Sequence, residues 1–245
     1  MTFGSDSTGL RESKTSGGVD RSHGRAGVQK GVFFLIHCVS FAICVYVVFG
    51  RGDVASGQRW QVVDSLRARL VLGVTALYLV RHGITLLYLL KRRVEWSEAI
   101  GLGFFLILFE VGFCVLAAGM LRRVAAPIGA ADYVAIAMVL VGSFLNTYSE
   151  MQRKWWKDKP ENKGRCYTQG LFGLSMHINY FGDTVLFTGW SILTATLWTL
   201  VLPVFMGSMF VFYHIPGLDS YLEQRYGDEF TEYRKRTKEF IPFVY

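Results

Sequence analysis

The chain has 245 residues, of which 51% are hydrophobic and 18% are charged, whereas about 25% charged residues is usual for soluble proteins. This composition argues against a disordered chain and against an ordinary soluble domain. Lysine and arginine outnumber aspartate and glutamate by 26 to 19, and a net charge of +7 occurs in nucleic-acid-binding proteins and in membrane proteins alike. The positions of the charges decide between these two classes.

Residues 1–30 are polar and rich in Gly, Ser and Thr, so we expect a disordered N-terminal tail. An uncharged run from Gly31 to Gly50 follows, and as a helix of about 30 Å it would cross a bilayer core. The block 170–214 is read as two more helices that are joined near 194–199. We therefore predict an all-α, polytopic membrane bundle of about six transmembrane helices, followed by a cytoplasmic amphipathic C-terminal segment. The other three predicted transmembrane stretches of the chain are Leu70–Leu90, Ala99–Met120 and Ala131–Tyr148.

Most Lys and Arg residues of the connecting segments are expected on one side of the membrane. The segments 1–30, 91–98, 149–169 and 215–245 carry 19 of them, whereas the alternate loops carry six. Because positive residues mark cytoplasmic loops, both termini are predicted to be cytoplasmic and no nucleic-acid partner is expected. The chain then divides into the tail, a four-helix membrane region over 31–148 and a cofactor-binding membrane domain over 149–245. The cysteines have neither metal-site nor disulfide spacing, so no metal is expected.

Glu110 lies near the middle of an apolar stretch, where an ionisable group costs about 2.5–3.5 kcal/mol to insert. That cost favours a functional role as a proton donor or a substrate-orienting carboxyl. The alternative is a structural pair with Arg81 or His82, which are themselves interpreted as structural polar groups facing the bundle. His37 has no polar companion in its own helix, so it is interpreted as a core histidine.

The segment 149–183 has the densest polar chemistry of the chain. Its cations stand beside aromatic residues, which suits an anionic ligand with a flat ring, such as a phosphorylated nucleotide. The alternative is anchoring at the membrane interface by lysines and tryptophans. The residues are Arg153, Lys154 and Lys157 with Trp155, Trp156 and Tyr167.

Four polar residues follow at the mouth of the next apolar helix, namely His177, Asn179, Tyr180 and Asp183. Helical spacing allows the last three to point into one pocket. An aspartate without a partner at that depth would be costly, and a carboxamide or a ribose hydroxyl of a ligand would satisfy it. The polar tail over 217–245 carries an apolar stripe that is broken near Gly227, so it either closes over this mouth or lies on lipid headgroups.

The segment NKGRCYTQGLFGLSMHINYFGD, with the later HIPGLDSYLEQRYGDEFTEYRKRTKEFIPFVY, resembles the C-terminal domain of the steroid 5-alpha-reductase family. The resemblance is greatest to its DUF1295 branch and more distant to sterol reductases such as the lamin B receptor and the delta-14 reductases. Its most specific part is the stretch 179–183, which matches the family signature N-Y-x-G-D/E. The terminal pattern Y-G-x-x-F…P-F-x-Y follows at the usual distance.

The resemblance implies a membrane-embedded, NADPH-dependent reductase that transfers hydride to a C=C bond of a lipophilic substrate such as a sterol, a steroid or an enone lipid. Glu110 and Tyr180 are the catalytic candidates, with Glu110 as the membrane acid. A eukaryotic member would be expected in the endoplasmic reticulum. Asn179, Tyr180 and Asp183 would contact the nicotinamide and ribose, and the basic residues would contact the phosphates. The full predicted cofactor site is Arg153, Lys154, Lys157, Tyr167, His177, Asn179, Tyr180, Asp183 and Tyr221.

Departures from the family pattern leave some alternatives open. Met176 and Ile178 replace the usual Arg and Pro, which leaves the preference for NADPH over NADH open. The stretch 218–220 reads Leu-Asp-Ser where sterol reductases have R-D-E, so the substrate need not be a steroid. The rival hypothesis is an S-adenosylmethionine-dependent methyltransferase of the isoprenylcysteine or phospholipid type, but those enzymes carry a Glu-Glu pair at 218–219. A non-catalytic lipid-binding or scaffold protein is the third hypothesis.

Overall fold

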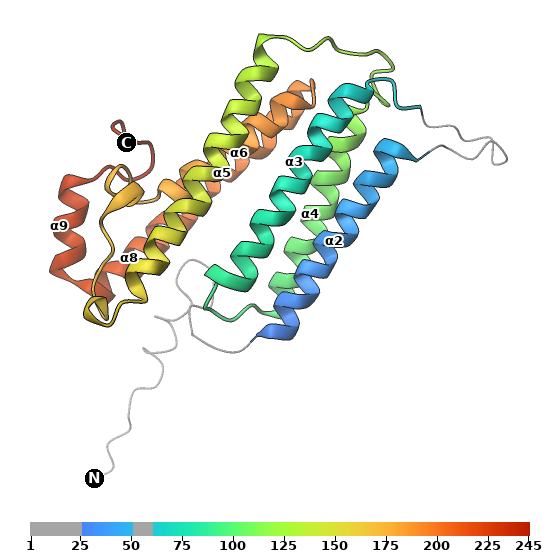
Figure 1. The fold of residues 1–245 in the computed structure, drawn as a ribbon. Coiled ribbons are helices and arrows are strands. Elements are labelled where there is room, and N and C mark those ends of the chain that lie inside the picture. The colour runs from blue at the N-terminus through green and yellow to red at the C-terminus, as the bar shows by residue number, and fades with distance from the viewer. Residues whose placement is uncertain (1–25, 51–60) are drawn as a thin grey trace.

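The computed structural model describes residues 26–50 and 61–245, and the regular elements of these ranges are helices (Figure 1). The prediction of an all-α membrane bundle is confirmed. In chain order the helices are α2 (Gly27–Phe49), α3 (Ser65–Ile84), η3 (Thr85–Leu89), α4 (Trp96–Ala117), α5 (Ala130–Lys157), η4 (Pro160–Asn162), η5 (Gly170–Gly173), α6 (Ile178–Leu193), η6 (Leu197–Leu200), α7 (Val201–Met209), η7 (Phe210–His214), α8 (Ile215–Tyr226) and α9 (Asp228–Arg236).

Five helical stretches are long and apolar enough to cross a membrane. The sixth apolar helix, α6, has 16 residues and is shorter than the about 20 residues that span a bilayer core. The interruption near 194–199 is confirmed, because α6 ends at Leu193 and η6 begins at Leu197. The five stretches are Gly27–Phe49, Ser65–Leu89, Trp96–Ala117, Ala130–Lys157 and Leu197–Tyr226.

One helix is longer than its apolar stretch, because α5 continues beyond Tyr148 to Lys157. Residues with good helix propensity, including Glu, Met, Gln, Arg and Lys, continue the helix after the apolar run has ended, and Pro160 follows soon after. The basic residues of this stretch therefore lie on the last turns of α5 and not in a loop. The expected boundary between the two membrane regions, at 148–149, falls inside this helix.

The helices form two groups that α3 joins (Figure 1). The first group is α2, α3 and α4, and the second is α5, α6 and α7. Helices α5 and α6 approach closely through glycines, since a Cβ added at Gly182 would lie 2.7 Å from the backbone nitrogen of Asn146 and 2.8 Å from the carbonyl oxygen of Gly142. Such backbone-to-backbone packing is typical of small residues at membrane helix interfaces. It holds the first turns of α6 against α5.

An aromatic cluster fills the space between the two groups. The ring of Tyr78 on α3 lies 5.5 Å, centroid to centroid, from both Phe187 and Trp190 on α6. Phe109 on α4 lies 5.4 Å from the same two rings. Trp190 is fully buried, so these edge-to-face contacts form the centre of the core.

The predicted break near Gly227 is observed: residues before it continue the stretch Leu197–Tyr226, which is long and apolar enough to cross a membrane, and α9 after it folds back onto the segment before α6. The break lies at Gly227, whose φ of 52° suits glycine. Beyond it, Phe230 and Tyr233 of α9 pack on Cys166 and Met176. The backbone after α9 contacts the loop before α6, because the amide of Met176 donates to the carbonyl of Lys238 at 2.8 Å. The tail therefore fixes the position of the polar segment that precedes α6.

Candidate functional site

A network of polar side chains joins α3, α5 and α6 around Arg81, near the C-terminal end of α3. Nη2 of this buried arginine donates to Oδ1 of Asp183 at 2.9 Å and to Oδ1 of Asn146 at 2.7 Å. Its Nε donates to Oγ1 of Thr147 at 3.0 Å. Asp183, which the sequence left without a partner, is thus paired with a guanidinium. The interpretation of Arg81 as a structural group omitted this contact, because the two residues lie far apart in the chain.

Asn179 joins the same network through its backbone and its side chain. Asn146 Nδ2 donates to the Asn179 carbonyl at 3.0 Å, and Asn179 Nδ2 donates to Glu150 Oε1 at 3.0 Å. The other oxygen of Glu150 accepts from Arg153. Sequence reasoning missed Asn146 and Glu150, although they belong to a polar stripe at helical spacing, 143, 146, 147 and 150, that could have revealed them.

Tyr180 lies on a different side of α6, so the expected single pocket for Asn179, Tyr180 and Asp183 is wrong. Its ring stacks on Phe210 of η7 with centroids 4.5 Å apart and on the ring of His177 at 5.8 Å. Neighbouring positions on a helix point about 100° apart, which separates Tyr180 from Asn179.

His177 forms a buried pair with a residue that was not among the predicted site residues. Its Nε2 lies 2.8 Å from Oδ1 of Asp219 on α8, and both side chains are nearly fully buried. Oδ2 of Asp219 is also buried and has no hydrogen-bond partner within the described ranges. Asp219 was noted only as part of the Leu-Asp-Ser stretch that stands in place of the R-D-E triplet, and its partner His177 lies just before α6.

The three predicted phosphate-binding cations do not converge. Arg153 pairs with Glu150, as described above. Lys154 donates to Asp158 at 2.5 Å, and hydrogen bonds from Lys154 and Lys91 hold the pKa of the Asp158 carboxyl below its usual value. Lys157 instead contacts Tyr226 of α8, donating to its hydroxyl at 2.8 Å. The carboxylates offset the charges of the first two cations.

Lys157 and the predicted Tyr221 meet in a cation–aromatic cluster at the end of α8. Nζ of Lys157 lies 4.5 Å from the centroid of the Tyr226 ring, and Cζ of Arg225 lies 5.6 Å from the same centroid. Arg225 also donates to the hydroxyl of Tyr221. The hydrogen-bond partners described for the two cations are neutral oxygens. This cluster therefore has positive charge available for an anion, and Arg225 is a residue that the sequence analysis missed.

Tyr167 lies apart from the Arg81 network. Its ring packs 5.4 Å from Trp156 and 5.7 Å from Phe172, centroid to centroid. Burial raises the pKa of its hydroxyl. Tyr167 therefore belongs to an apolar cluster with Phe172 and Ile178 in the connection between α5 and α6.

Glu110 is fully buried in a second polar cluster, which α2, α3 and α4 form. Ser40 Oγ donates to its Oε2 at 2.6 Å, and His37 Nε2 lies 2.9 Å from its Oε1. Nδ1 of His37 lies 2.7 Å from Nδ1 of His82. The alternative of a direct pair between Glu110 and Arg81 or His82 is therefore not observed. His37 is fully buried, as expected of a core histidine, but it has polar partners on two other helices. Their partners lie on other helices, which periodicity within one helix does not show.

Tyr78 lies between the two clusters. Its ring is 5.5 Å from the ring of His37 and 5.5 Å from Cζ of Arg81. Glu110 is thus separated from the Arg81 network by one aromatic layer. The two predicted catalytic residues, Glu110 and Tyr180, belong to different clusters.

The chain is similar to a known family and to a curated protein. The family described as "Protein of unknown function (DUF1295)" matches residues 91–237, more than half of the chain. The "Probable O-methyltransferase ustE" of Ustilaginoidea virens is 31% identical over 96 residues, which cover 38% of this chain and 34% of that protein. The chain thus matches about a third of the length of that relative. Glu110, Asn179, Asp183 and Asp219 lie within the family match, whereas Arg81, His37 and His82 lie before it.

Proposed function

Because the chain belongs to the DUF1295 family and has the helices of a multi-pass membrane protein, we propose that it is a membrane-embedded reductase that uses NADPH to reduce a C=C bond of a lipophilic substrate. The observation that carries the proposal is the network of Arg81, Asn146, Asn179 and Asp183. It gathers guanidinium, amide and carboxylate groups at one end of three membrane helices. Such groups recognise carboxamides and ribose hydroxyls through hydrogen bonds.

Two buried atoms without partners fit a polar ligand at this end of the bundle. Nη1 of Arg81 is a donor and Oδ2 of Asp219 is an acceptor, and neither has a hydrogen-bond partner in the described part of the chain. Buried polar atoms without partners are costly, and a ligand would relieve that cost. The phosphates would be held by Lys157 and Arg225 beside Tyr226. NADPH, when bound, would supply the hydride.

The second hydrogen of the reduction would come, as a proton, from the Glu110 cluster. The contact between Glu110 Oε1 and His37 Nε2 can hold one proton, and Ser40 fixes the other carboxyl oxygen. His82 contacts His37 and belongs to the same cluster. A buried acid of this kind can act as a general acid in a site without water.

We also propose that the Arg81 end of the bundle faces the cytoplasm, in the endoplasmic reticulum if the source is eukaryotic. The basic segments 91–98 and 149–169 support this orientation, because they connect helices at that end. NADPH is a cytosolic cofactor, and a cytoplasmic site would be accessible to it.

A second candidate function, methyl transfer from S-adenosylmethionine, is favoured by the 31% identity to the probable O-methyltransferase.

A cofactor titration of the full chain in detergent separates these functions. If the reductase proposal is correct, NADPH raises the melting temperature and S-adenosylmethionine does not, since a ligand that binds only the folded state stabilises it. At 100 times Kd the stabilisation is about 2.7 kcal/mol. A shift with S-adenosylmethionine alone would replace reduction by methyl transfer. A shift with neither, together with lipid binding, would favour a non-catalytic lipid-binding protein.

A matched pair of variants locates the cofactor. Asp183→Ala should abolish the shift with NADPH, because it removes the carboxylate that pairs with Arg81. Glu232→Ala removes an exposed carboxylate of α9, paired only with Lys235 among the described residues, and should retain the full shift. Equal shifts in the two variants would place the cofactor elsewhere.

A further inference from the structure

Three ionisable side chains of α2, α3 and α4 contact one another in series. Nδ1 of His82 lies 2.7 Å from Nδ1 of His37, and Nε2 of His37 lies 2.9 Å from Oε1 of Glu110. An imidazole ring can accept a proton at one nitrogen while it releases a proton from the other. This histidine series, His82–His37–Glu110, therefore has the geometry to pass a proton from its first member to its last.

The histidine series runs inwards from the end of the bundle that carries Arg81. The start of α2 and the end of η3 lie together at this end, because Nζ of Lys30 donates to the carbonyl of Leu90. At about 1.5 Å per helical residue, His82 lies about 10 Å from the end of η3, His37 about 15 Å from the start of α2 and Glu110 about 21 Å from the start of α4. Glu110 is thus the deepest member.

The burial of the three side chains changes in the same direction. His37 and Glu110 are fully buried, whereas His82 is half-buried. Aromatic rings pack around the two histidines: Phe33 lies 4.5 Å from His82 and Tyr78 lies 5.5 Å from His37, centroid to centroid. His82 is therefore the accessible member of the histidine series.

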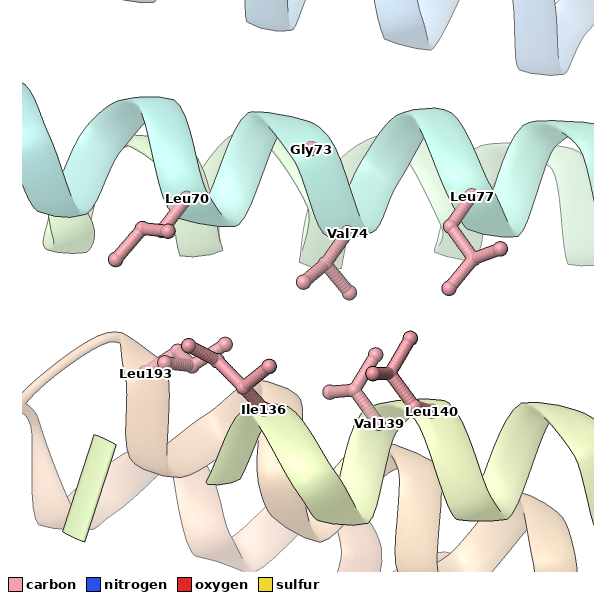
Figure 2. A pocket seen from close by; sticks show the side chains of 8 residues that line it. All are labelled: Leu70, Gly73, Val74, Leu77, Ile136, Val139, Leu140 and Leu193. Carbon is pink, nitrogen blue, oxygen red and sulfur yellow. The ribbon is translucent and has the colours of Figure 1, made fainter. Parts of the chain in front are cut away.

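Two grooves in the described part of the chain offer Glu110 no second route to water. The groove between α3 and α5 has a volume of about 160 Å³, and its lining in Figure 2 consists of Leu, Val, Ile and Gly residues. The groove between α6 and α7 has a volume of about 420 Å³. The lining of neither groove includes a member of the histidine series, so water in these grooves does not contact the carboxyl.

We propose that the histidine series is a proton relay, in which His82 is the entrance, His37 the carrier and Glu110 the acid that is recharged. A proton that binds Nε2 of His82 displaces the proton on its Nδ1 to Nδ1 of His37. His37 then releases its Nε2 proton to Oε1 of Glu110, and the carboxylate becomes a carboxylic acid. One proton enters, one carboxylate is neutralised, and each histidine changes from one neutral tautomer to the other.

The surroundings of Glu110 favour this end point. An ionised carboxylate at membrane depth is costly, and the guanidinium of Arg81 is already paired with Asp183. Ser40 donates to Oε2 of Glu110 at 2.6 Å, which leaves Oε1 as the oxygen that faces His37. Use of the delivered proton in a reduction rests on the proposed reductase function, whereas the relay itself does not.

The test follows the exchange of the Glu110 proton with solvent. In the full chain in detergent, infrared spectroscopy detects the C=O stretch of a protonated carboxyl, and the band that is missing from Glu110→Gln belongs to Glu110. Transfer to D2O shifts this band as a deuteron replaces the proton. The rate of the shift measures how fast protons reach Glu110, and it requires neither substrate nor cofactor.

His82→Asn is the main variant, because the amide can keep the contact with Nδ1 of His37 but does not carry a proton. The matched control is His214→Asn, since His214 is also half-buried and lies in η7, outside the relay. His82→Asn should slow the exchange about 100-fold, a typical contribution of a positioned proton-transfer group, and His214→Asn should leave it unchanged. Wild-type exchange in His82→Asn, or no Glu110 band in the wild-type chain, would overturn the proposal.

Added imidazole distinguishes a relay from a structural contact. His82→Ala opens a space beside Nδ1 of His37, in which imidazole can bind and carry the proton. Imidazole should therefore accelerate the exchange in His82→Ala and have no effect in the wild-type chain, with the melting temperature as the check that the variant is folded. A folded His82→Ala variant whose exchange does not respond to imidazole would contradict the relay.

The relay and the reductase function fail by different results. If exchange follows the expected pattern while NADPH gives no shift of the melting temperature, the relay stands and the reductase function fails. If NADPH gives the shift while exchange in His82→Asn is unchanged, the reductase function stands and the relay fails.

Discussion

Two buried arginines stand on the same face of α3, about four helical turns apart, and they differ in how fully their donors are used. Arg67, near the start of the helix, binds Asp132 and the Leu193 carbonyl through Nη1. Its Nη2 donates to Asp132 and to two backbone carbonyls of the connection between α4 and α5. Its Nε has no hydrogen-bond partner among the described residues, although it lies 3.4 Å from Oδ2 of Asp64. Arg81 uses Nε and Nη2 and leaves Nη1 without a partner in the described part of the chain.

The difference is that both terminal nitrogens of Arg67 are paired and its Nε lies beside a carboxylate, whereas Arg81 keeps a terminal nitrogen whose two N–H groups are unused within the described residues. Arg67 satisfies the end of α6 and the turn before α5, so it closes one end of the bundle. Arg81 fixes the opposite ends of α5 and α6 while it keeps a donor for a ligand.

Removal of the Arg67 clamp should have the largest effect on stability. Arg67→Met leaves Asp132 buried without its partner, which costs about 3–5 kcal/mol and lowers the melting temperature in detergent by roughly 10 °C. The control is Arg69→Met, an exposed arginine two positions later, which should shift the melting temperature by less than about 2 °C. Similar melting temperatures for the two variants would contradict the structural role of Arg67.

Glu110→Gln tests whether turnover depends on the acid of the neighbouring Glu110 cluster. Loss of a general acid typically costs about 100-fold or more in turnover, or about 2.7 kcal/mol. The amide retains the size of the side chain and a carbonyl oxygen that can accept from Ser40, so the shift with NADPH should remain. Turnover is measured as NADPH oxidation with an alkenyl ketone. Normal turnover with intact cofactor binding would remove Glu110 from the role of proton donor.

Arg81→Met should separate binding from stability. Asp183 keeps a side chain that is 23% exposed, so its unpaired carboxylate costs less than that of Asp132, about 1–3 kcal/mol. The melting temperature should therefore fall less than in Arg67→Met, while the shift with NADPH disappears. Arg93→Met, which removes an exposed arginine near the same end, should retain the shift. A retained shift in Arg81→Met would show that the unused donor does not serve the cofactor.

The positions of the helices could be predicted from the sequence because the cost of burying charge in a membrane limits where helices cross. The uncharged run at 31–50 and the break near 194–199 both correspond to observed features. The end of α5 could not be predicted, since the helix continues into a polar stretch where helix propensity and not hydropathy decides.

The contacts between polar groups on different helices were harder to predict from the sequence. Asp183 and Arg81 are 102 positions apart, and Glu110 and His37 are 73 apart; helical spacing within one segment predicts neither contact. Gly182 explains part of the N-Y-F-G-D stretch physically, since a Cβ there would collide with the backbone of α5. Which side of α6 faces α5 follows from this glycine, so Asp183, beside it, is brought to Arg81 while Tyr180 turns towards Phe210.

Asp219→Asn carries the smallest expected effect and tests the other unused atom at the Arg81 end of the bundle. Asparagine can still accept from His177 through Oδ1, but it replaces Oδ2 with a donor. The change in stability should therefore stay within about 1 kcal/mol, whereas NADPH affinity, measured by the dependence of the melting temperature on cofactor concentration, should fall about five- to tenfold. Asp228→Asn, at the exposed start of α9, serves as the control and should change neither quantity. If Asp219→Asn lowers stability and leaves the affinity intact, Asp219 serves only to fix His177, and Nη1 of Arg81 remains as the unused buried atom that we propose for the cofactor.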